Sequence, residues 1–337
     1  MRDGPGAGAH REPVAPVPEG VERPLWSVMI PTYECAGYLR QTLESVLAQD
    51  PGPERMQVEV VDDHSTGDDP EAVVREVGGG RVGFFRQPRN VGHVRNFNTC
   101  LRRSRGRLVH LLHGDDAVRE GFYRRMGEAF EARPEIGAAF CRHLVMDEDG
   151  HWTVVSKLEE PRSGVLENWL ERIAVGQRLQ APSMVVRREA YERLGGFDDR
   201  IAHYGEDWEM WVRIAARYPV WYETEPLAVY RVSSRSLSGR TVRSGENGRD
   251  LRRAIEINRD ALPPARADAI SRAAREANAH ACLRRAFRLA NAGEMDASLA
   301  QLRESVRFSR APSVLGTAAG VLGVWLARRV RPARRRA

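Results

Sequence analysis

The sequence predicts an α/β fold, a Rossmann-like and mostly parallel sheet flanked by helices, with an α-helical C-terminal extension. Short apolar runs alternate with helical patterns over the first half of the chain, which is typical of a parallel sheet with helices on both faces. Beyond Gly245 the pattern is helical throughout. At 337 residues the chain is long enough for two domains or for one large elaborated domain.

The individual elements follow from these patterns in chain order. The expected strands of the first half are "WSVMIP", "VEVVDD", "RVGFFRQ" and "RLVHLL", and helices are expected over about 36–48, 70–77 and 91–103. Next come a hairpin, "AAFCRHLVMD" with "GHWTVVS", and a strand running into a helix, "APSMVVRREAYERLGGF". Glu206 and Asp207 then fall in the first turn of the helix that contains Trp208 and Trp211.

Charge and cysteine content exclude some classes of function. The formal net charge is +6, but 46 acidic residues accompany 52 basic ones, and the last ten residues hold six Arg. We therefore expect no nucleic-acid partner. The four cysteines are scattered singly, which argues against a disulfide framework or a zinc cluster and fits a reducing compartment, so a cytoplasmic location is expected.

Two pairs of carboxylates end two strands of the predicted sheet. Asp62 and Asp63 follow one strand, and Asp115 and Asp116 follow another. Either pair alone is explained by ordinary turn or helix-cap chemistry. Both pairs lie at the carboxyl ends of strands, however, where ligands bind in sheets of this kind. Their shared edge therefore favours a functional site.

A cluster of carboxylates is the ligand type that a hard divalent cation such as Mg²⁺ or Mn²⁺ prefers. Such an ion usually completes its shell with phosphate and water, so a diphosphate-bearing substrate is expected. The sequence holds no "GxxxxGK[ST]" and no "GxGxxG" after its first strand. The expected binding of a diphosphate therefore does not depend on a P-loop or on the glycine-rich loop of a dinucleotide-binding fold.

Four stretches of the sequence, in this order, are similar to one enzyme family. They are "SVMIPTYECAGYLRQTLESVLAQ", "VEVVDDHSTGD", "NVGHVRNFNTCLRRSRGRLVHLLHGDD" and "GFDDRIAHYGEDWEMWVRIA". Together they resemble the family 2 glycosyltransferases of the GT-A fold, which are mostly inverting enzymes that use nucleoside-diphosphate sugars. The resemblance covers about residues 26–239.

The resemblance implies a role for several residues of the donor site. Pro31 and Tyr33 would line the nucleoside pocket, Asp63 would hydrogen-bond the base, and Arg95 would lie near the diphosphate. Asp115 would be the metal ligand of the DXD-type motif, with Mn²⁺ or Mg²⁺ as the cofactor, and its neighbour Asp116 would share the donor site.

The resemblance also implies the catalytic base, which is Asp207 or its neighbour Glu206. Acidic residues in a first helical turn also have an ordinary explanation in the helix dipole. The sequence departs from the family pattern at Glu34, at His64 and at Ser233. It departs again at His113, which stands where many members have the first Asp of the metal motif, so that Asp115 and Asp116 are left with most of the metal binding.

Five parts of the chain are expected. They are a disordered leader over 1–24, the nucleotide-sugar-binding half of the GT-A domain over 25–125, its acceptor-binding half over 126–240, a helical appendage over 241–310, and an apolar helix with a basic tail over 311–337. The leader is expected because it is rich in Pro and Gly and has no apolar core of a signal peptide.

The predicted function is a metal-dependent inverting transfer of a sugar, from UDP or dTDP in preference, to a hydroxyl of a glycan, a glycolipid or another envelope-type acceptor. A non-catalytic sugar-nucleotide-binding or scaffold protein of the same fold is the alternative, and the intact "HGDD" and "GED" weigh against it. A nucleotidyltransferase would carry a Gly-rich basic loop after the first strand, where this chain has "PTYECAG".

The apolar stretch over 313–327 has two interpretations. As a helix it would span about 22 Å, which is short of the roughly 30 Å hydrocarbon core of a bilayer. One interpretation is a helix lying on an anionic membrane surface, anchored by the terminal arginines, which would place the enzyme peripherally at the inner face of the plasma membrane. The other is a helix packed on the protein, for which "GTAAG" is equally suited.

Overall fold

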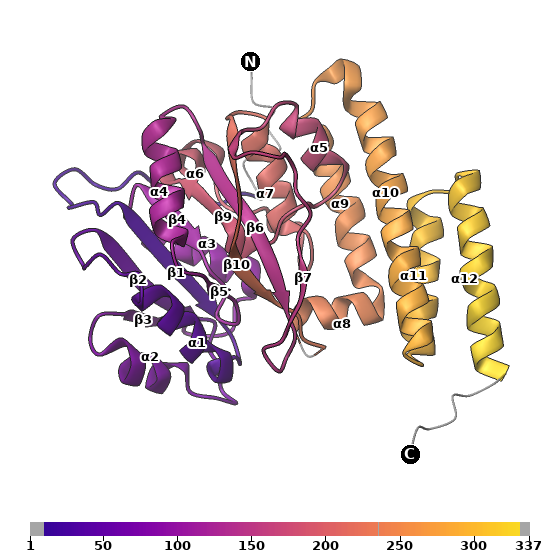
Figure 1. Ribbon diagram of the computed structural model, residues 1–337, viewed down its shortest axis with the longest axis horizontal. Helices are drawn as coiled ribbons and strands as arrows, with labels where there is room; N and C mark the ends of the chain where they lie inside the picture. The colour runs from indigo at the N-terminus through magenta and orange to yellow at the C-terminus, as the bar shows by residue number, and fades with distance from the viewer. Residues whose placement is uncertain (1–9, 235, 331–337) are drawn as a thin grey trace. The chain divides into compact units, whose positions relative to one another are not determined.

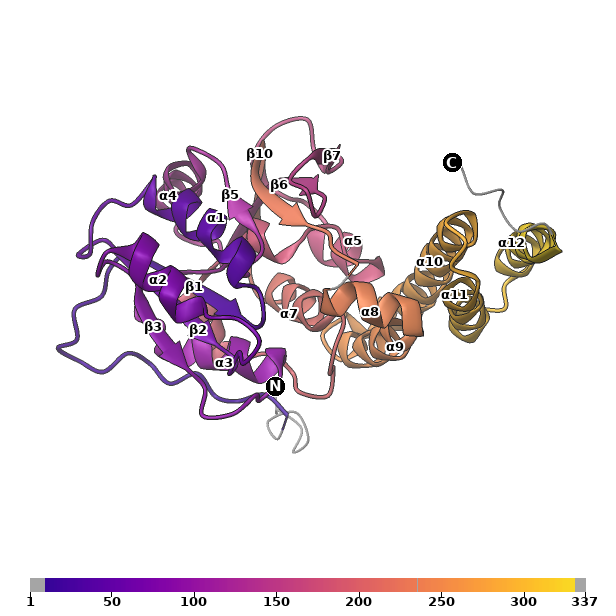
Figure 2. The same cartoon turned by 90° about the horizontal axis from the view of Figure 1, so that it is seen from below.

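The computed structural model describes residues 10–234 and 236–330, and the chain folds into two compact units. The first unit contains the chain up to residue 169 together with 178–199 and 213–232. The second contains 170–177, 200–212 and the chain from 233 onward. The first unit is built on the sheet and the second is helical (Figures 1 and 2).

One ten-stranded sheet forms the centre of the first unit, with the strand order β3-β2-β1-β4-β9-β6-β10-β5 and with β7 on β6 and β8 on β10. The strands are β1 (Trp26–Thr32), β2 (Met56–Asp62), β3 (Gly83–Arg86), β4 (Leu108–Leu111), β5 (Ala117–Val118), β6 (Ala138–Met146), β7 (Trp152–Val155), β8 (Gly164–Val165), β9 (Met184–Arg187) and β10 (Val220–Arg231).

Helices accompany this sheet in the alternation that the sequence predicts. They are α1 (Ala36–Leu47), α2 (Pro70–Gly78), α3 (His93–Arg103), α4 (Phe122–Ala132) and α6 (Arg188–Leu194), with a short 3₁₀ turn over Ala181–Ser183. Helices α5 (Trp169–Val175) and α7 (Glu206–Ala215) have residues in both units. The α/β class is therefore confirmed.

The sheet is parallel from β3 through β2 and β1 to β4, and it becomes mixed beyond β4. Strand β9 lies between β4 and β6 and is antiparallel to both. The predicted hairpin is confirmed, because β7 pairs antiparallel with β6. The uninterrupted parallel run is therefore formed by the first four strands, and β6 and β10 form a further parallel pair.

The parallel register sets the position of the site. All seven residues of β1 are buried, because strands flank it on both edges and its faces lie in the core. Thr32, the last residue of β1, is in register with Asp62, the last residue of β2, and Met29 is in register with Leu111 of β4. The loops that follow β1, β2 and β4 therefore begin at the same edge of the sheet.

Residues 10–24 correct part of the prediction of a disordered leader, since they pack against other residues of the first unit. The carboxylate of Asp198 is completely buried and pairs with the Arg11 guanidinium at 3.0 Å. Gly196 donates a backbone hydrogen bond to the Glu12 carbonyl, and Val14 is buried. This segment is ordered by an ion pair and backbone hydrogen bonds, which a composition rich in Pro and Gly does not reveal. Residues 1–9 lie outside the described part of the chain.

The second unit contains α8 (Leu237–Ser244), α9 (Glu246–Arg259), α10 (Pro264–Asn291), α11 (Met295–Phe308) and α12 (Pro312–Val330). Helices α10 and α11 form a pair, and the chain turns between them at Gly293, whose φ of +82° suits glycine. Helix α12 packs on this pair (Figure 1).

Helix α12 has one buried and one exposed face. Val314, Val321 and Trp325 are buried, and the Trp325 indole donates to the Met295 carbonyl at 2.9 Å. Leu315 and Leu322 belong to the exposed face. Over the described residues, no helix combines the length and apolarity that crossing a membrane requires. Because Val314, Val321 and Trp325 are buried, the interpretation of 313–327 as a helix packed on the protein is correct for this face of the helix.

Candidate active site

The loops after β1, β2 and β4 are tied to one another by backbone hydrogen bonds. The Asp63 amide donates to the Thr32 carbonyl at 2.9 Å, and the Gly114 amide donates to the Pro31 carbonyl at 3.0 Å. A Cβ atom on Gly114 would lie 2.9 Å from the Cys35 sulfur, so a larger residue there would have to displace the Cys35 side chain. The structure therefore brings the two predicted carboxylate motifs to one sheet edge.

Asp62 and Asp63 have different surroundings. The Asp62 carboxylate is completely buried and is bound by Ser65 and by the Arg86 guanidinium at 2.8 Å, so its role is structural. The Asp63 carboxylate accepts from the amides of Val91 at 2.8 Å and Gly92 at 3.0 Å. Burial raises the pKa of Asp63, and these two amides oppose the shift. Two hydrogen bonds leave acceptor capacity on the Asp63 carboxylate for a ligand N–H.

The other predicted donor-site residues differ in exposure. Pro31 is buried within β1, whereas Tyr33 is 49% exposed and Arg95 is exposed on α3. Glu34 has a left-handed φ of +50°, and its carboxylate accepts from the amides of Thr66 and Gly67 at 2.9 and 3.0 Å. Those amides hold the pKa of Glu34 below its usual value. The departure from the family pattern at Glu34 thus ties the loop after β1 to the loop after β2.

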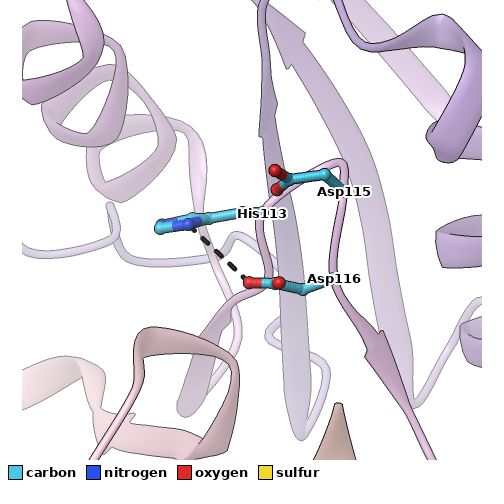
Figure 3. A group of neighbouring side chains, drawn as sticks. All are labelled: His113, Asp115 and Asp116. Atoms are coloured by element: carbon cyan, nitrogen blue, oxygen red, sulfur yellow. Dashed lines mark ion pairs between the residues drawn. The ribbon is translucent and has the colours of Figure 1, made fainter. Parts of the chain in front are cut away.

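Three side chains of the loop after β4 form a group that can hold a metal ion. Ligand atoms of His113, Asp115 and Asp116 lie within 4.8 Å of one another (Figure 3). The side chain of Asp116 is 1% exposed, its Oδ1 accepts from the Arg231 amide at 2.9 Å, and its Oδ2 has no hydrogen-bond partner among the described residues. Asp116 Oδ2 lies 3.8 Å from His113 Nδ1.

The electrostatics of this group favour a cation. Burial raises the pKa of Asp115. The pKa of Asp116 lies well above its usual value, mainly because of burial and next because of the negative charge of Asp115. Two desolvated carboxylates side by side repel each other unless a positive charge compensates them. The orphaned Oδ2 of Asp116 and the oxygen-rich donor set therefore fit a divalent ion.

Arg231 is a residue of this site that the sequence patterns did not single out. It ends β10 and is 5% exposed. Its Nε donates to the Asp115 carbonyl at 3.0 Å, its Nη1 donates to the Asp147 carbonyl at 3.1 Å, and its Nη2 donates to the Gln41 side chain. The guanidinium also lies over the Tyr38 ring at 4.3 Å. Arg231 therefore joins the metal-site loop to the β6–β7 turn and to α1.

Asp207 and Glu206 lie in the second unit, in the first turn of α7 as predicted. The partly exposed Asp207 carboxylate accepts from the Gln177 amide at 2.6 Å. Desolvation raises the pKa of Asp207 to about 7, and the negative charge of Glu206 adds to the shift. The Glu206 side chain is buried. A carboxyl group with this pKa accepts and releases a proton near neutral pH, as a general base must.

A second acidic group lies in the β6–β7 turn. Asp147, Asp149 and His151 also have ligand atoms within 4.8 Å, but Asp149 and His151 are exposed. The amides of Asp149 and His151 donate to Asp147 Oδ1 at 3.0 and 2.9 Å. This is the side-chain-to-backbone chemistry of an ordinary turn.

An α/β sheet with carboxylates at the carboxyl ends of its parallel strands places this chain in the class of α/β proteins that bind ligands at that edge of the sheet. Within that class, the model of glycosyl transferase family 2 matches residues 27–195, and the model of glycosyltransferase like family 2 matches residues 165–256. The chain belongs to glycosyl transferase family 2 and is a glycosyltransferase.

Curated relatives match about two thirds of the chain. An uncharacterised protein of Mycobacterium tuberculosis is 29% identical over 244 residues, which cover 69% of this chain and 75% of the relative. An uncharacterised glycosyltransferase of Methanocaldococcus jannaschii is 24% identical over 221 residues, which cover 64% of this chain and 73% of the relative.

Solved structures share the fold. Staphylococcus aureus TarS 1–349 in complex with UDP-GlcNAc superposes with a TM-score of 0.63 at 16% identity, covering 92% of this chain and 93% of that one. The mannosyltransferase PcManGT of Pyrobaculum calidifontis, in complex with GDP-Man and Mn²⁺, has a TM-score of 0.54 at 20% identity, covering 96% and 92% of the two chains.

Proposed function

We propose that this glycosyltransferase is metal-dependent and inverting, and that it transfers a sugar from a nucleoside-diphosphate sugar to an acceptor hydroxyl. The observation that carries the proposal is the buried Oδ2 of Asp116, which has no hydrogen-bond partner among the described residues and lies in one group with Asp115 and His113. Asp115 would be the principal ligand of Mn²⁺ or Mg²⁺. The bound ion would neutralise negative charge on the departing nucleoside diphosphate.

For the donor we propose a uridine or thymidine diphosphate sugar. Asp63 supports this choice, since a carboxylate with acceptor capacity left suits the N–H of a pyrimidine ring. The exposed Tyr33 and Arg95 are free to contact the nucleoside and the diphosphate, and Pro31 supports the wall of the pocket from β1. TarS, a protein with the same fold, binds UDP-GlcNAc.

For the chemical step we propose that Asp207 takes the proton of the acceptor hydroxyl as that oxygen attacks the anomeric carbon opposite the leaving group, which inverts the configuration. The raised pKa of Asp207, about 7, matches a base that works near neutral pH. Glu206, its neighbour in the same turn, is the alternative base.

For the acceptor we propose a glycan or a lipid-linked molecule at an anionic membrane surface, with the enzyme at the cytoplasmic face. Two features support this location. The outward face of α12 exposes Leu315, Leu322 and Leu326, and six arginines lie in the last ten residues of the chain. An apolar helical face beside a basic segment is the pattern that binds anionic lipid.

A panel of nucleotide sugars tests the proposal. Purified protein should release nucleoside diphosphate from a uridine or thymidine diphosphate sugar in the presence of Mn²⁺ or Mg²⁺ and an acceptor extract. Protein that binds the donor with metal but transfers nothing to any acceptor would instead support the non-catalytic binding protein.

A further inference from the structure

We propose that His113 is a nitrogen ligand of the bound cation, and that it makes the site prefer Mn²⁺ and Co²⁺ over Mg²⁺. This inference rests on the proposed function, because it requires that Asp115 holds a divalent ion. It goes further by naming a ligand at a position where the family motif often has an aspartate.

The distance between His113 and Asp116 suits two ligands of one ion. His113 Nδ1 and Asp116 Oδ2 lie 3.8 Å apart, which is too long for a hydrogen bond. Two ligand atoms at about 2.1 Å from an octahedral ion lie about 3.0 Å apart when adjacent and about 4.2 Å apart when opposite. The observed separation is short enough for both atoms to bind one ion after a small movement of the side chains. Asp115 is drawn beside them in Figure 3 and belongs to the same group, whose ligand atoms all lie within 4.8 Å of one another.

The ring of His113 is held in place before any ion binds. It stacks on Phe97 with 5.0 Å between ring centroids and 19° between the ring planes. Phe97 in turn packs edge-on against Phe197 at 5.5 Å. A ring fixed by stacking has little rotational freedom left, so Nδ1 stays directed toward Asp116. A pre-oriented ligand loses less conformational entropy when it binds an ion.

The chemistry of imidazole gives the metal preference. Carboxylate oxygens suit Mg²⁺ and Mn²⁺ alike, whereas an imidazole nitrogen favours first-row transition ions, and affinity at a mixed nitrogen and oxygen site rises from Mn²⁺ to Co²⁺. Mg²⁺ takes hard oxygen ligands and keeps its waters. With His113 in place of the motif's first aspartate, the site therefore binds Mg²⁺ more weakly than it binds Mn²⁺ and Co²⁺.

The experiment measures metal binding directly in the full-length protein. Mn²⁺ is titrated in the presence of UDP and followed by electron paramagnetic resonance, and Mg²⁺ and Co²⁺ compete for the site. Pulsed measurements on the Mn²⁺-loaded protein report whether a histidine nitrogen is coordinated. The variants are His113→Phe, which keeps the ring on Phe97 without nitrogen, and His113→Asp, which restores the oxygen ligand. His151→Phe in the exposed turn group is the matched control.

The wild type should show nitrogen coupling and should bind Mn²⁺ about tenfold or more tightly than Mg²⁺. His113→Phe should lose the nitrogen coupling and bind Mn²⁺ about tenfold more weakly. His113→Asp should bring the affinities for Mn²⁺ and Mg²⁺ closer together. His151→Phe should change neither the coupling nor the metal affinities. Circular dichroism and melting temperature identify variants that fail to fold.

Mn²⁺ bound without nitrogen coupling in the wild type, or an unchanged affinity in His113→Phe, would overturn the assignment of His113 as a ligand. If Asp115→Asn still abolished Mn²⁺ binding in that case, the proposed metal dependence would stand and only the role of His113 would fail. If Asp115→Asn also bound Mn²⁺ normally, the proposed metal site itself would be wrong.

Discussion

The Arg231 guanidinium donates a hydrogen bond from Nε to the backbone carbonyl of Asp115, with 3.0 Å between the two atoms. The backbone amide of Arg231 donates to the Asp116 carboxylate at 2.9 Å. One residue at the end of β10 therefore fixes both the backbone and a side chain of the metal-site loop. Its positive charge is also a cause that lowers the pKa of both Asp115 and Asp116, against the larger effect of burial.

Arg231→Gln should raise the metal concentration needed for half-maximal activity by about tenfold, because the loop loses its support although Asp115 and Asp116 remain. Measuring activity against Mn²⁺ concentration tests this. Arg142→Gln is the matched control, since that guanidinium binds a backbone carbonyl, that of Ser156, in the same sheet. An equal shift in both variants would mean that Arg231 acts only through stability.

The activity should depend on pH through Asp207. The protonated carboxyl cannot act as a base, and the raised pKa of about 7 means that activity should fall as the pH drops through about 7. The rate of transfer measured between pH 5 and 9 checks this. A rate that stays constant down to pH 5 would contradict the assignment of Asp207.

Asp207→Asn should lower turnover by roughly a hundredfold or more with little change in donor affinity, because Asn keeps the volume but cannot accept the proton. Glu206→Gln is the paired variant on the same helical turn. If only Glu206→Gln is inactive, the base is Glu206. If neither variant changes the rate, the favourable interaction with the helix dipole is enough to explain why both acidic residues stand in the first turn of α7.

Free nucleoside diphosphates should compete with the donor in an order set by Asp63. Uridine and thymidine diphosphates should inhibit best, followed by guanosine diphosphate. Asp63→Asn should weaken the inhibition by uridine diphosphate by about tenfold, because a hydrogen bond to a charged acceptor is lost. Strongest inhibition by adenosine diphosphate would show that Asp63 does not read the base as proposed.

The exposed face of α12 should determine binding to anionic vesicles. Leu322→Glu with Leu326→Glu should lower the bound fraction at least about tenfold, because the two exposed side chains can no longer bury apolar surface. Val314, Val321 and Trp325 keep the helix packed in this variant. Leu158→Glu, at an exposed leucine of the first unit, is the control in a sedimentation assay. Sedimentation unchanged by the double substitution would remove the membrane surface from the proposal.

Local patterns predicted the fold and part of the site. The strands before Asp63 and Asp115 were recognisable as apolar runs, and in a parallel sheet their ends must meet at one edge. Arg231 could not be found in this way, because its partners Gln41, Asp115 and Asp147 are far from it in the sequence. The sequence shows His113 only as a departure from the family's aspartate, because its closeness to Asp116 depends on the geometry of the loop.

The central claim is that a divalent ion held through Asp115 is required for sugar transfer. It is tested most directly by measuring nucleoside diphosphate release from a uridine or thymidine diphosphate sugar, with and without excess chelator, in the wild type and in Asp115→Asn. Chelation should abolish release, Mn²⁺ should restore it, and Asp115→Asn should lower it by about a hundredfold or more. Asp149→Asn, in the exposed turn group, should behave as the wild type. Full turnover in excess chelator, or an unchanged rate in Asp115→Asn, would contradict the claim.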